Sequence, residues 1–474
     1  MILEATNQDK TLYSDKTRFR SIAISCFILL CSFFSLVFFR TISIKIPALY
    51  IVTACTMYLI VLYKNSINKY EAGIFFFLFI QLLALTLEFD ELSVHTFSVY
   101  LLSYRYGISS RGFIATIIDI LSNGSFISKH FVWNFIFCAT ILLIFLISVY
   151  LGSVIKKSEN SNIKSFALFL CLLCLTCFAS PVAYFTSHNF GRPEVYALLF
   201  MLLLMAAIDK PYLKWVIPFF ALFTMSIHII LVFFYIPFIF ILLFYKLPDK
   251  KEYIVLFFAT FAVVAASFIL YLLFRKQTFM FSDASAFVEY LKTDFFDNRN
   301  IDYIKNFMHM IFFADMQDHL LGWQNRVIGE SGGLLKFSGT VCVLINLPLV
   351  LLFAYFWIKC FLLEKQRYMK LFFILPVLLF IYHIPVFFLF YDFGRWTIMI
   401  ILIQFMLIFY LIHTKNKTAL LVAEKITPVI KKHWWIIIVF CLVMFFLEPV
   451  RTIGPSDRVR YIYNGFLDLL KITL

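Results

Sequence analysis

The chain has 474 residues, of which 62% are hydrophobic, 20% are aromatic and only 14% are charged. Soluble domains have roughly 45–50% apolar and about 25% charged residues, so the composition excludes a soluble globular protein. It also excludes intrinsic disorder and an outer-membrane barrel, whose strands alternate apolar with polar residues. The sequence therefore predicts an all-α, polytopic integral membrane protein. In such a protein the net charge of +14 reports which loops face the cytoplasm, and no nucleic-acid partner is expected.

Apolar runs flanked by charged residues mark the predicted membrane spans, because a span needs roughly 20 apolar residues. The first run follows a basic flank without a small-residue cleavage site, so we interpret it as a retained signal-anchor. Together the runs predict about thirteen spans in a single membrane domain, residues 1–474, with no internal repeat. The predicted spans are 21–39, 46–63, 73–87, 131–155, 165–184, 195–208, 215–227, 229–245, 253–274, 339–358, 371–391, 396–412 and 434–447.

Lysines set the predicted orientation, because cytoplasmic loops are enriched in Lys and Arg. With a cytoplasmic N-terminus, nearly every lysine-rich loop falls on one side. The stretch 215–245 is ambiguous between one long span and two short ones. We prefer two, because a single span would place Lys246, Lys250 and Lys251 outside and invert every later loop.

The two long outer loops, 88–130 and 275–338, differ from the lysine-rich loops by mixing acids, arginines, histidines and aromatic residues. In the first loop, apolar residues recur at helical spacing from Phe113 to Leu121, which predicts a helix lying along the membrane surface. The second loop contains amphipathic stretches at 284–296 and 301–313, together with Trp323. It either covers a sugar chain or forms a structural cap.

Four outer loops offer an acid together with arginine or histidine at one predicted membrane depth. Charges near a bilayer are unfavourable unless they are paired or functional, so the set predicts a site. For any single residue the alternative is an interfacial anchor that holds its helix at the membrane surface. The candidate substrate-binding residues are Arg105, Arg111, His188, Arg192, Glu194, His228 and Arg395.

The chemistry of these residues favours glycosyl transfer. A guanidinium group binds phosphate oxygens bidentately and keeps its charge, which suits a phosphate or diphosphate headgroup. A carboxylate beside it can deprotonate an attacking sugar hydroxyl. We expect a polyprenyl-phosphate- or polyprenyl-diphosphate-linked donor at the outer face of the membrane, with arginine stabilising the departing phosphate. The candidate bases are Asp90, then Glu88 and Glu91, with Asp392 as the alternative from a second loop.

A family resemblance rests on Phe190-Gly-Arg192, followed by a short apolar span, a lysine-containing turn and Ser226-Ile-His228. This order resembles the arginine-then-histidine pattern of EpsG-like and Wzy-like polysaccharide polymerases, and the number of spans is similar to that of bacterial O-antigen polymerases. The resemblance implies an inner-membrane polymerase that transfers undecaprenyl-diphosphate-linked repeats, alongside other membrane proteins of polysaccharide assembly. It also implies functional roles for Arg192 and His228. The chain departs from some O-antigen polymerases in lacking a second arginine-rich outer-loop motif.

Two other functions stay open. An acidic pair in an early outer loop, followed by surface helices, also resembles GT-C-type transferases that use a polyprenyl-phosphate sugar; here, however, Glu88 and Asp90 follow the third predicted span rather than the first. A lipid-linked saccharide flippase or transporter would need polar groups or broken helices near the middle of the bilayer. The predicted spans hold few such groups, chiefly Gln81, His383 and Gln404.

No cofactor is predicted. The ten cysteines lie inside or at the edges of apolar runs, without the spacing of a metal site. A divalent cation stays an alternative in the second outer loop, which holds His309, Asp315, Asp318 and His319. The same loop matches G-x-S-x-G at 329–333, but a nucleophile elbow needs an α/β sheet, so we interpret this segment as a glycine-rich turn.

Overall fold

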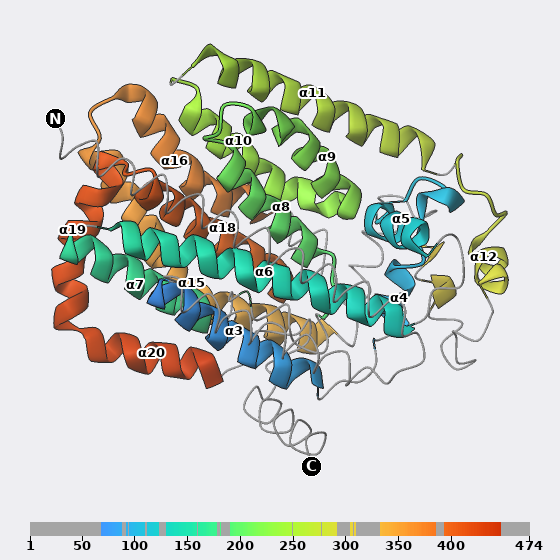
Figure 1. Ribbon diagram of the computed structural model, residues 1–474, viewed down its shortest axis with the longest axis horizontal. Coiled ribbons are helices and arrows are strands. Elements are labelled where there is room, and N and C mark those ends of the chain that lie inside the picture. The colour runs from blue at the N-terminus through green and yellow to red at the C-terminus, as the bar shows by residue number, and fades with distance from the viewer. Residues whose placement is uncertain are drawn as a thin grey trace, which may run out of the picture.

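The computed structural model describes residues 68–87, 92, 94–109, 111–122, 129–158, 160–177, 181, 190–248, 250–275, 277–291, 304–306, 308–309, 332–384 and 393–446. Predicted spans 21–39 and 46–63 lie outside these residues. Within the described part of the chain the regular elements are helices and no strand occurs (Figure 1). The all-α class is therefore confirmed.

Helices coincide with every predicted span that falls on described residues. Two of them end early: α7 ends at Thr176 and α16 ends at Tyr382. The main helices are α3 (Lys69–Leu87), α6 (Lys129–Lys157), α7 (Ser161–Thr176), α8 (Glu194–Ala207), α9 (Ile217–Ile227), α10 (Tyr235–Lys246), α11 (Lys251–Phe274), α15 (Gly332–Leu363), α16 (Arg367–Tyr382), α18 (Phe393–His413), α19 (Lys417–Lys432) and α20 (Trp434–Phe446).

Five helical stretches are long and apolar enough to cross a membrane, or six if α19 and α20, which are bent by 87°, form one broken span. Their length and composition suit a lipid bilayer. Other apolar helices, including α7, α8 and α9, are shorter. The count of about thirteen spans, with a cytoplasmic N-terminus, therefore stays a prediction.

The lysine-rich ends of several helices meet at one end of the bundle, which we call the basic end. The Nζ atom of Lys246, at the end of α10, lies 2.8 Å from Oδ1 of Asp209, which follows α8. Asn416, between α18 and α19, donates from Nδ2 to the Tyr245 hydroxyl at 3.3 Å. Thr418 donates to Oε2 of Glu364, which follows α15, at 2.6 Å. These contacts gather the loops after α8, α10, α15 and α18.

Helices α9 and α10 form a hairpin. Lys214, just before α9, pairs with Glu252 at the start of α11, whereas Lys246 at the end of α10 pairs with Asp209. The start of α9 and the end of α10 therefore both lie at the basic end, and the chain reverses between the two helices. It does so at His228, whose backbone is extended, and continues through the short 3-10 helix η4 (Ile229–Phe233). This turn is what the preferred two-segment interpretation of 215–245 requires.

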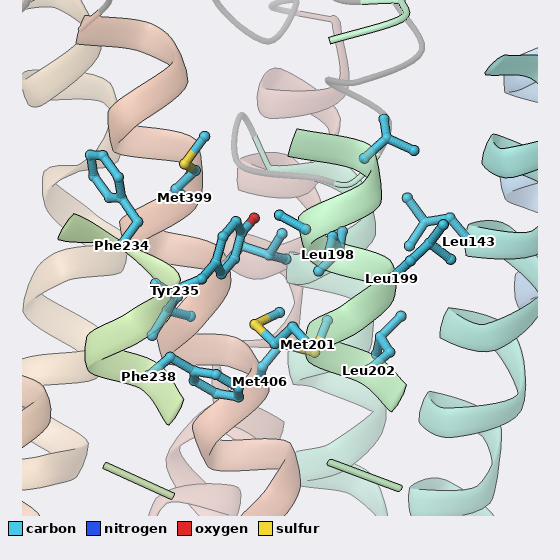
Figure 2. Packing of buried hydrophobic residues seen from close by; sticks show 14 of the residues in the cluster. Leu143, Leu198, Leu199, Met201, Leu202, Phe234, Tyr235, Phe238, Met399 and Met406 are labelled. Atoms are coloured by element: carbon cyan, nitrogen blue, oxygen red, sulfur yellow. The ribbon is translucent and has the colours of Figure 1, made fainter. Parts of the chain in front are cut away.

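The core centres on α18. Of the apolar stretch of α18 that is long enough to cross a membrane, 94% is buried, whereas 17% of the corresponding stretch of α11 is buried. Figure 1 shows α11 along one edge of the bundle. Figure 2 shows side chains of α8, α10 and α18 packing together in the interior, among them Met201, Tyr235 and Met406. The side chains that begin α8 and α18 are therefore held by a tightly packed scaffold.

The helix predicted between Phe113 and Leu121 is present as α5 (Gly112–Leu121), and its placement along the membrane surface stays a prediction. Its residues Ile114 and Ile118 are buried, whereas Ile120 is 72% exposed. The ring of Phe113 stacks on Phe223 of α9 with centroids 4.9 Å apart. In the second outer loop, the predicted stretch 284–296 is helical as α12 (Ala284–Tyr290), and 292–300 lies outside the described residues. Of stretch 301–313, the described residues 304–306 and 308–309 are helical.

Candidate functional site

The predicted site residues divide into two groups. Six of the candidates are described, and they lie in η1 (Tyr104–Tyr106), at the start of α5, α8 and α18, or in the turn after α9, at the end of the bundle away from the basic end. These six are Arg105, Arg111, Arg192, Glu194, His228 and Arg395. Glu88, Asp90, Glu91, His188 and Asp392 lie outside the described residues. All four candidate bases belong to this second group, so their roles stay predictions.

The structure joins Glu194 and Arg395 in a buried ion pair. Nη1 of Arg395 lies 3.3 Å from Oε1 of Glu194, and the two side chains are 5% and 0% exposed. Glu194 begins α8, where the helix dipole favours an acid. Arg395 lies in the first turn of α18, where the same dipole disfavours a cation. Helix stability therefore does not account for Arg395, and its carboxylate partner is needed to keep it buried.

The Glu194 carboxylate keeps unused acceptor capacity. The contact with Arg395 is an ion pair without hydrogen-bond geometry, and neither carboxylate oxygen accepts a hydrogen bond from a described residue. Burying two charges is unfavourable by several kcal/mol per ion unless further hydrogen bonds satisfy their remaining polar atoms. An ion pair of this kind is weak as a stabilising device. It is typical of a place where a polar ligand or water completes the set.

Tyr100 fixes the loop that leads into Glu194. Its hydroxyl donates to the Gly191 carbonyl at 2.6 Å and lies 3.0 Å from the Tyr196 hydroxyl. Burial, reinforced by Tyr196 and then by the Glu194 charge, raises the pKa of Tyr100 well above its ordinary value. The hydroxyl therefore stays protonated and remains a donor. Neither tyrosine was predicted as a site residue, because nothing in the local sequence distinguishes them from interfacial tyrosines.

Gly191 gives the Phe190-Gly-Arg192 segment its shape. Its φ is +85°, a backbone conformation that residues with a side chain rarely adopt. A Cβ added at this position would lie 2.6 Å from Cγ2 of Thr96 and 2.7 Å from Cδ1 of Ile136. Glycine is therefore required on both conformational and steric grounds. Arg192 follows this turn directly and lies two residues before Glu194. The need for glycine in the turn explains the glycine of the Phe190-Gly-Arg192 motif.

Arg105 belongs to a separate, more exposed cluster. Its side chain is 42% exposed, and Nη1 lies 3.3 Å from Oδ1 of Asp119 on α5. Nη2 donates to the Tyr290 hydroxyl at 3.4 Å, and Ser103 donates to the other Asp119 oxygen at 2.9 Å. Asp119 and Tyr290 were not among the predicted site residues. The signal for Asp119 was its place as the acid of an otherwise apolar surface helix.

Two further candidate site residues, His228 and Arg111, lie near the cluster around Arg105. His228, 5% exposed, occupies the turn after α9. Tyr104 donates to the carbonyl of Ser226 at 3.2 Å, which brings the segment containing Arg105 beside that turn. Arg111 is half-buried at the start of α5. The described residues thus form a buried pair, Glu194 with Arg395, and an exposed cluster around Arg105.

Among the described residues, no group of three or more His, Cys, Asp or Glu side chains could hold a metal ion. Of the four residues weighed as cation ligands in the second outer loop, His309 is described and exposed, and Asp315, Asp318 and His319 lie outside the described part of the chain. The divalent cation therefore stays an untested alternative.

Comparisons with protein-family models, with curated proteins and with solved structures give no match to the chain.

Proposed function

We propose that this protein transfers glycosyl groups from polyprenyl-linked donors and so polymerises or extends a surface polysaccharide in the cell inner membrane. The observation that carries the proposal is the buried Glu194–Arg395 pair, at the end of the bundle away from the lysines. If the lysine-rich loops are cytoplasmic, this pair lies towards the outer face, where the headgroup of a translocated lipid-linked saccharide is found. The resemblance to Wzy-like and EpsG-like polymerases points the same way.

In the proposed reaction an acceptor hydroxyl attacks the anomeric carbon of the donor sugar. The bond between that carbon and the phosphate oxygen breaks, and the polyprenyl diphosphate leaves with the electron pair. Arg395, with Arg192 from the adjoining turn, binds the negative charge that develops on this leaving group. Glu194 orients the Arg395 guanidinium. The carboxylate oxygens of Glu194 can also accept a hydrogen bond from a hydroxyl group of the bound saccharide.

The proton of the attacking hydroxyl goes to a carboxylate of the adjoining loops. Asp392 immediately precedes α18, which carries Arg395, and Asp90 precedes the segment that contains Tyr100. These acids, with Glu88 and Glu91 as further candidates, are the proposed general bases. A GT-C-type reaction with a polyprenyl-phosphate sugar uses the same groups and differs in the leaving group.

A transport function has less support, because two of the three polar residues named within the predicted spans, Gln404 and His383, have internal partners. The third, Gln81, donates from Nε2 to the Phe77 carbonyl at 3.1 Å, and its Oε1 accepts no hydrogen bond from a described residue. Gln404 accepts from Trp357 Nε1 at 2.7 Å and donates to the Pro376 carbonyl at 3.0 Å. Nε2 of His383 lies 2.7 Å from the Phe233 carbonyl. Such contacts are typical of residues that hold helices together, whereas a transport pathway needs polar groups that face a passage.

The proposal can be tested on surface glycan and on purified protein. Asp90→Asn, Arg111→Ala and Arg192→Ala are each expected to abolish long-chain surface polysaccharide at unchanged protein levels in the membrane. Arg367→Ala is the matched control, because Arg367 is an exposed arginine at the start of α16, at the basic end of the bundle. Wild-type glycan ladders in all three variants would overturn the proposal.

Purified protein in liposomes separates the alternatives. Chain growth with a diphosphate-linked oligosaccharide is expected, whereas growth only with a monophosphate-linked sugar would favour the GT-C-type reaction. Movement of labelled lipid-linked saccharide across the bilayer without glycosyl transfer would favour a flippase.

A further inference from the structure

Helix α19 lies across the basic end of the bundle instead of running along it (Figure 1). It packs against α7, α15 and α18, and α20 leaves it at an angle of 87°. Asn416 caps its start, since Oδ1 accepts from the Ala419 amide at 3.0 Å. Residues 413–433 lie between the predicted spans 396–412 and 434–447, where no helix was predicted, so α19 is a feature that the structure adds.

One face of α19 is fixed to the bundle. Ala419, Val422, Ala423 and Thr427 are buried. Thr427 donates to the Asn162 carbonyl at 3.0 Å, and Lys431 donates to the Asn162 side chain at 2.9 Å. Because small side chains allow a close approach, α19 lies tightly against the start of α7.

The opposite face of α19 mixes cations with apolar side chains. Lys417, Leu421, Lys425, Val429 and Lys432 recur every three to four residues, and all five are exposed. A face that met only water would be polar along its length. Lysine stems that lie along apolar surface while their ammonium groups reach outward suit the headgroup layer of a bilayer.

Neighbouring residues agree with that depth. Trp434 and Trp435, which follow α19 directly, are 60% and 57% exposed, as is typical of aromatic residues at a membrane interface. Glu424, the acid of this helix, accepts from Asn160 Nδ2 at 2.6 Å and is not part of the exposed face. The helix dipole accounts for a lysine in the last turn, such as Lys432, but not for Lys417 or Lys425.

We infer that the exposed face of α19 rests in the interfacial layer of the membrane and binds the headgroups of anionic phospholipids. The lysines contact the phosphates, and Leu421 and Val429 reach the top of the acyl region. Binding pins the basic end to one leaflet, and through α7, α15 and α18 it holds the bundle at a fixed depth. This inference does not depend on glycosyl transfer.

The test compares full-length protein in nanodiscs of phosphatidylcholine with protein in nanodiscs that also contain phosphatidylglycerol. The variant K417Q/K425Q/K432Q removes the three exposed lysines of α19. The matched control K210Q/K250Q/K251Q removes three exposed lysines from loops elsewhere at the basic end. We expect the α19 variant to retain several-fold fewer phosphatidylglycerol molecules by native mass spectrometry and to lose the rise in Tm that this lipid gives, whereas the control keeps both.

Equal losses in the two variants would overturn the inference, since they would reflect diffuse charge, and so would unchanged lipid retention in the α19 variant. If that variant fails to fold, K417R/K425R/K432R takes its place and must keep lipid retention. A photo-crosslinking residue at Leu421 supplies an independent measurement. Crosslinks to phosphatidylglycerol are expected, and their absence would also overturn the inference.

Discussion

Oε1 of Glu194 and Nη1 of Arg395 lie 3.3 Å apart in the protein interior, although the residues belong to α8 and α18. Removing one partner of a buried ion pair leaves an uncompensated charge, which destabilises a fold by about 3–5 kcal/mol. We therefore expect Glu194→Gln and Arg395→Gln each to lower Tm strongly in detergent. The double variant should lose much less than the sum of the two, and additive losses would show that the side chains do not interact.

The second prediction concerns the paired tyrosines. Tyr100→Phe leaves the buried Gly191 carbonyl without its donor, a loss of about 1–3 kcal/mol. Tyr196→Phe leaves that hydrogen bond in place and should remove about 0.5–1.5 kcal/mol. Thermal unfolding of both variants gives the order. A larger effect of Tyr196→Phe would mean that Tyr100 does not hold the loop.

Two glycines provide a matched pair of alanine substitutions. At Gly191 alanine meets both a positive φ, unfavourable by about 1–2 kcal/mol, and contacts under 3 Å with Thr96 and Ile136. At Gly73, inside α3, an added Cβ meets nothing within 4 Å, so alanine should stabilise the helix by about 0.5–1 kcal/mol. We expect opposite shifts in Tm. Equal shifts would contradict the assigned turn.

A fourth prediction concerns pH. Burial works against ionisation of Glu364, but hydrogen bonds from Thr418 and from the amides of Gln366 and Lys365 outweigh it, and the pKa of Glu364 falls below its ordinary value of 4.5. The resulting stability is present above about pH 4.5 and is lost as pH falls through the lower folded-state pKa. Glu364→Gln should therefore flatten the acid side of a plot of Tm against pH. An unchanged acid side would contradict this.

The fifth prediction separates structure from transport. Gln404→Leu removes the acceptor for Trp357 and the donor to Pro376, so it should lower stability by about 1–2 kcal/mol in total. If Gln404 only joins helices, the remaining folded protein keeps its activity per molecule. A full loss of activity at normal stability would instead point to a polar path through the bundle.

The positions of the helices were predictable because runs of apolar residues indicate directly which segments can be buried. Two boundaries were placed too late in the sequence: predicted spans 165–184 and 371–391 continue beyond α7 and α16. Both helices end a few residues before a proline, Pro181 and Pro385, whose ring disfavours the continuation of a helix through it. That signal was present in the sequence.

The site was predictable only in part. Glu194 and Arg395 were candidates because each precedes a predicted span on the same side of the membrane. Their pairing depends on the starts of α8 and α18 coming together, which no local pattern encodes. Tyr100 acts through a loop carbonyl far along the chain, and its role therefore could not be predicted from the sequence near it.

The shortness of α8 and α9 has a consequence for the surrounding lipid. At about 1.5 Å per residue, their 14 and 11 residues rise about 21 Å and about 17 Å, against about 30 Å for the hydrocarbon of a bilayer. Leu203 and Phe219 are exposed on these helices, so lipid tails meet them there. A bilayer adapts to a short hydrophobic surface by thinning. Beside α8 and α9 the lipid phosphates therefore lie closer to the middle of the bilayer than elsewhere, nearer to the level of Arg395.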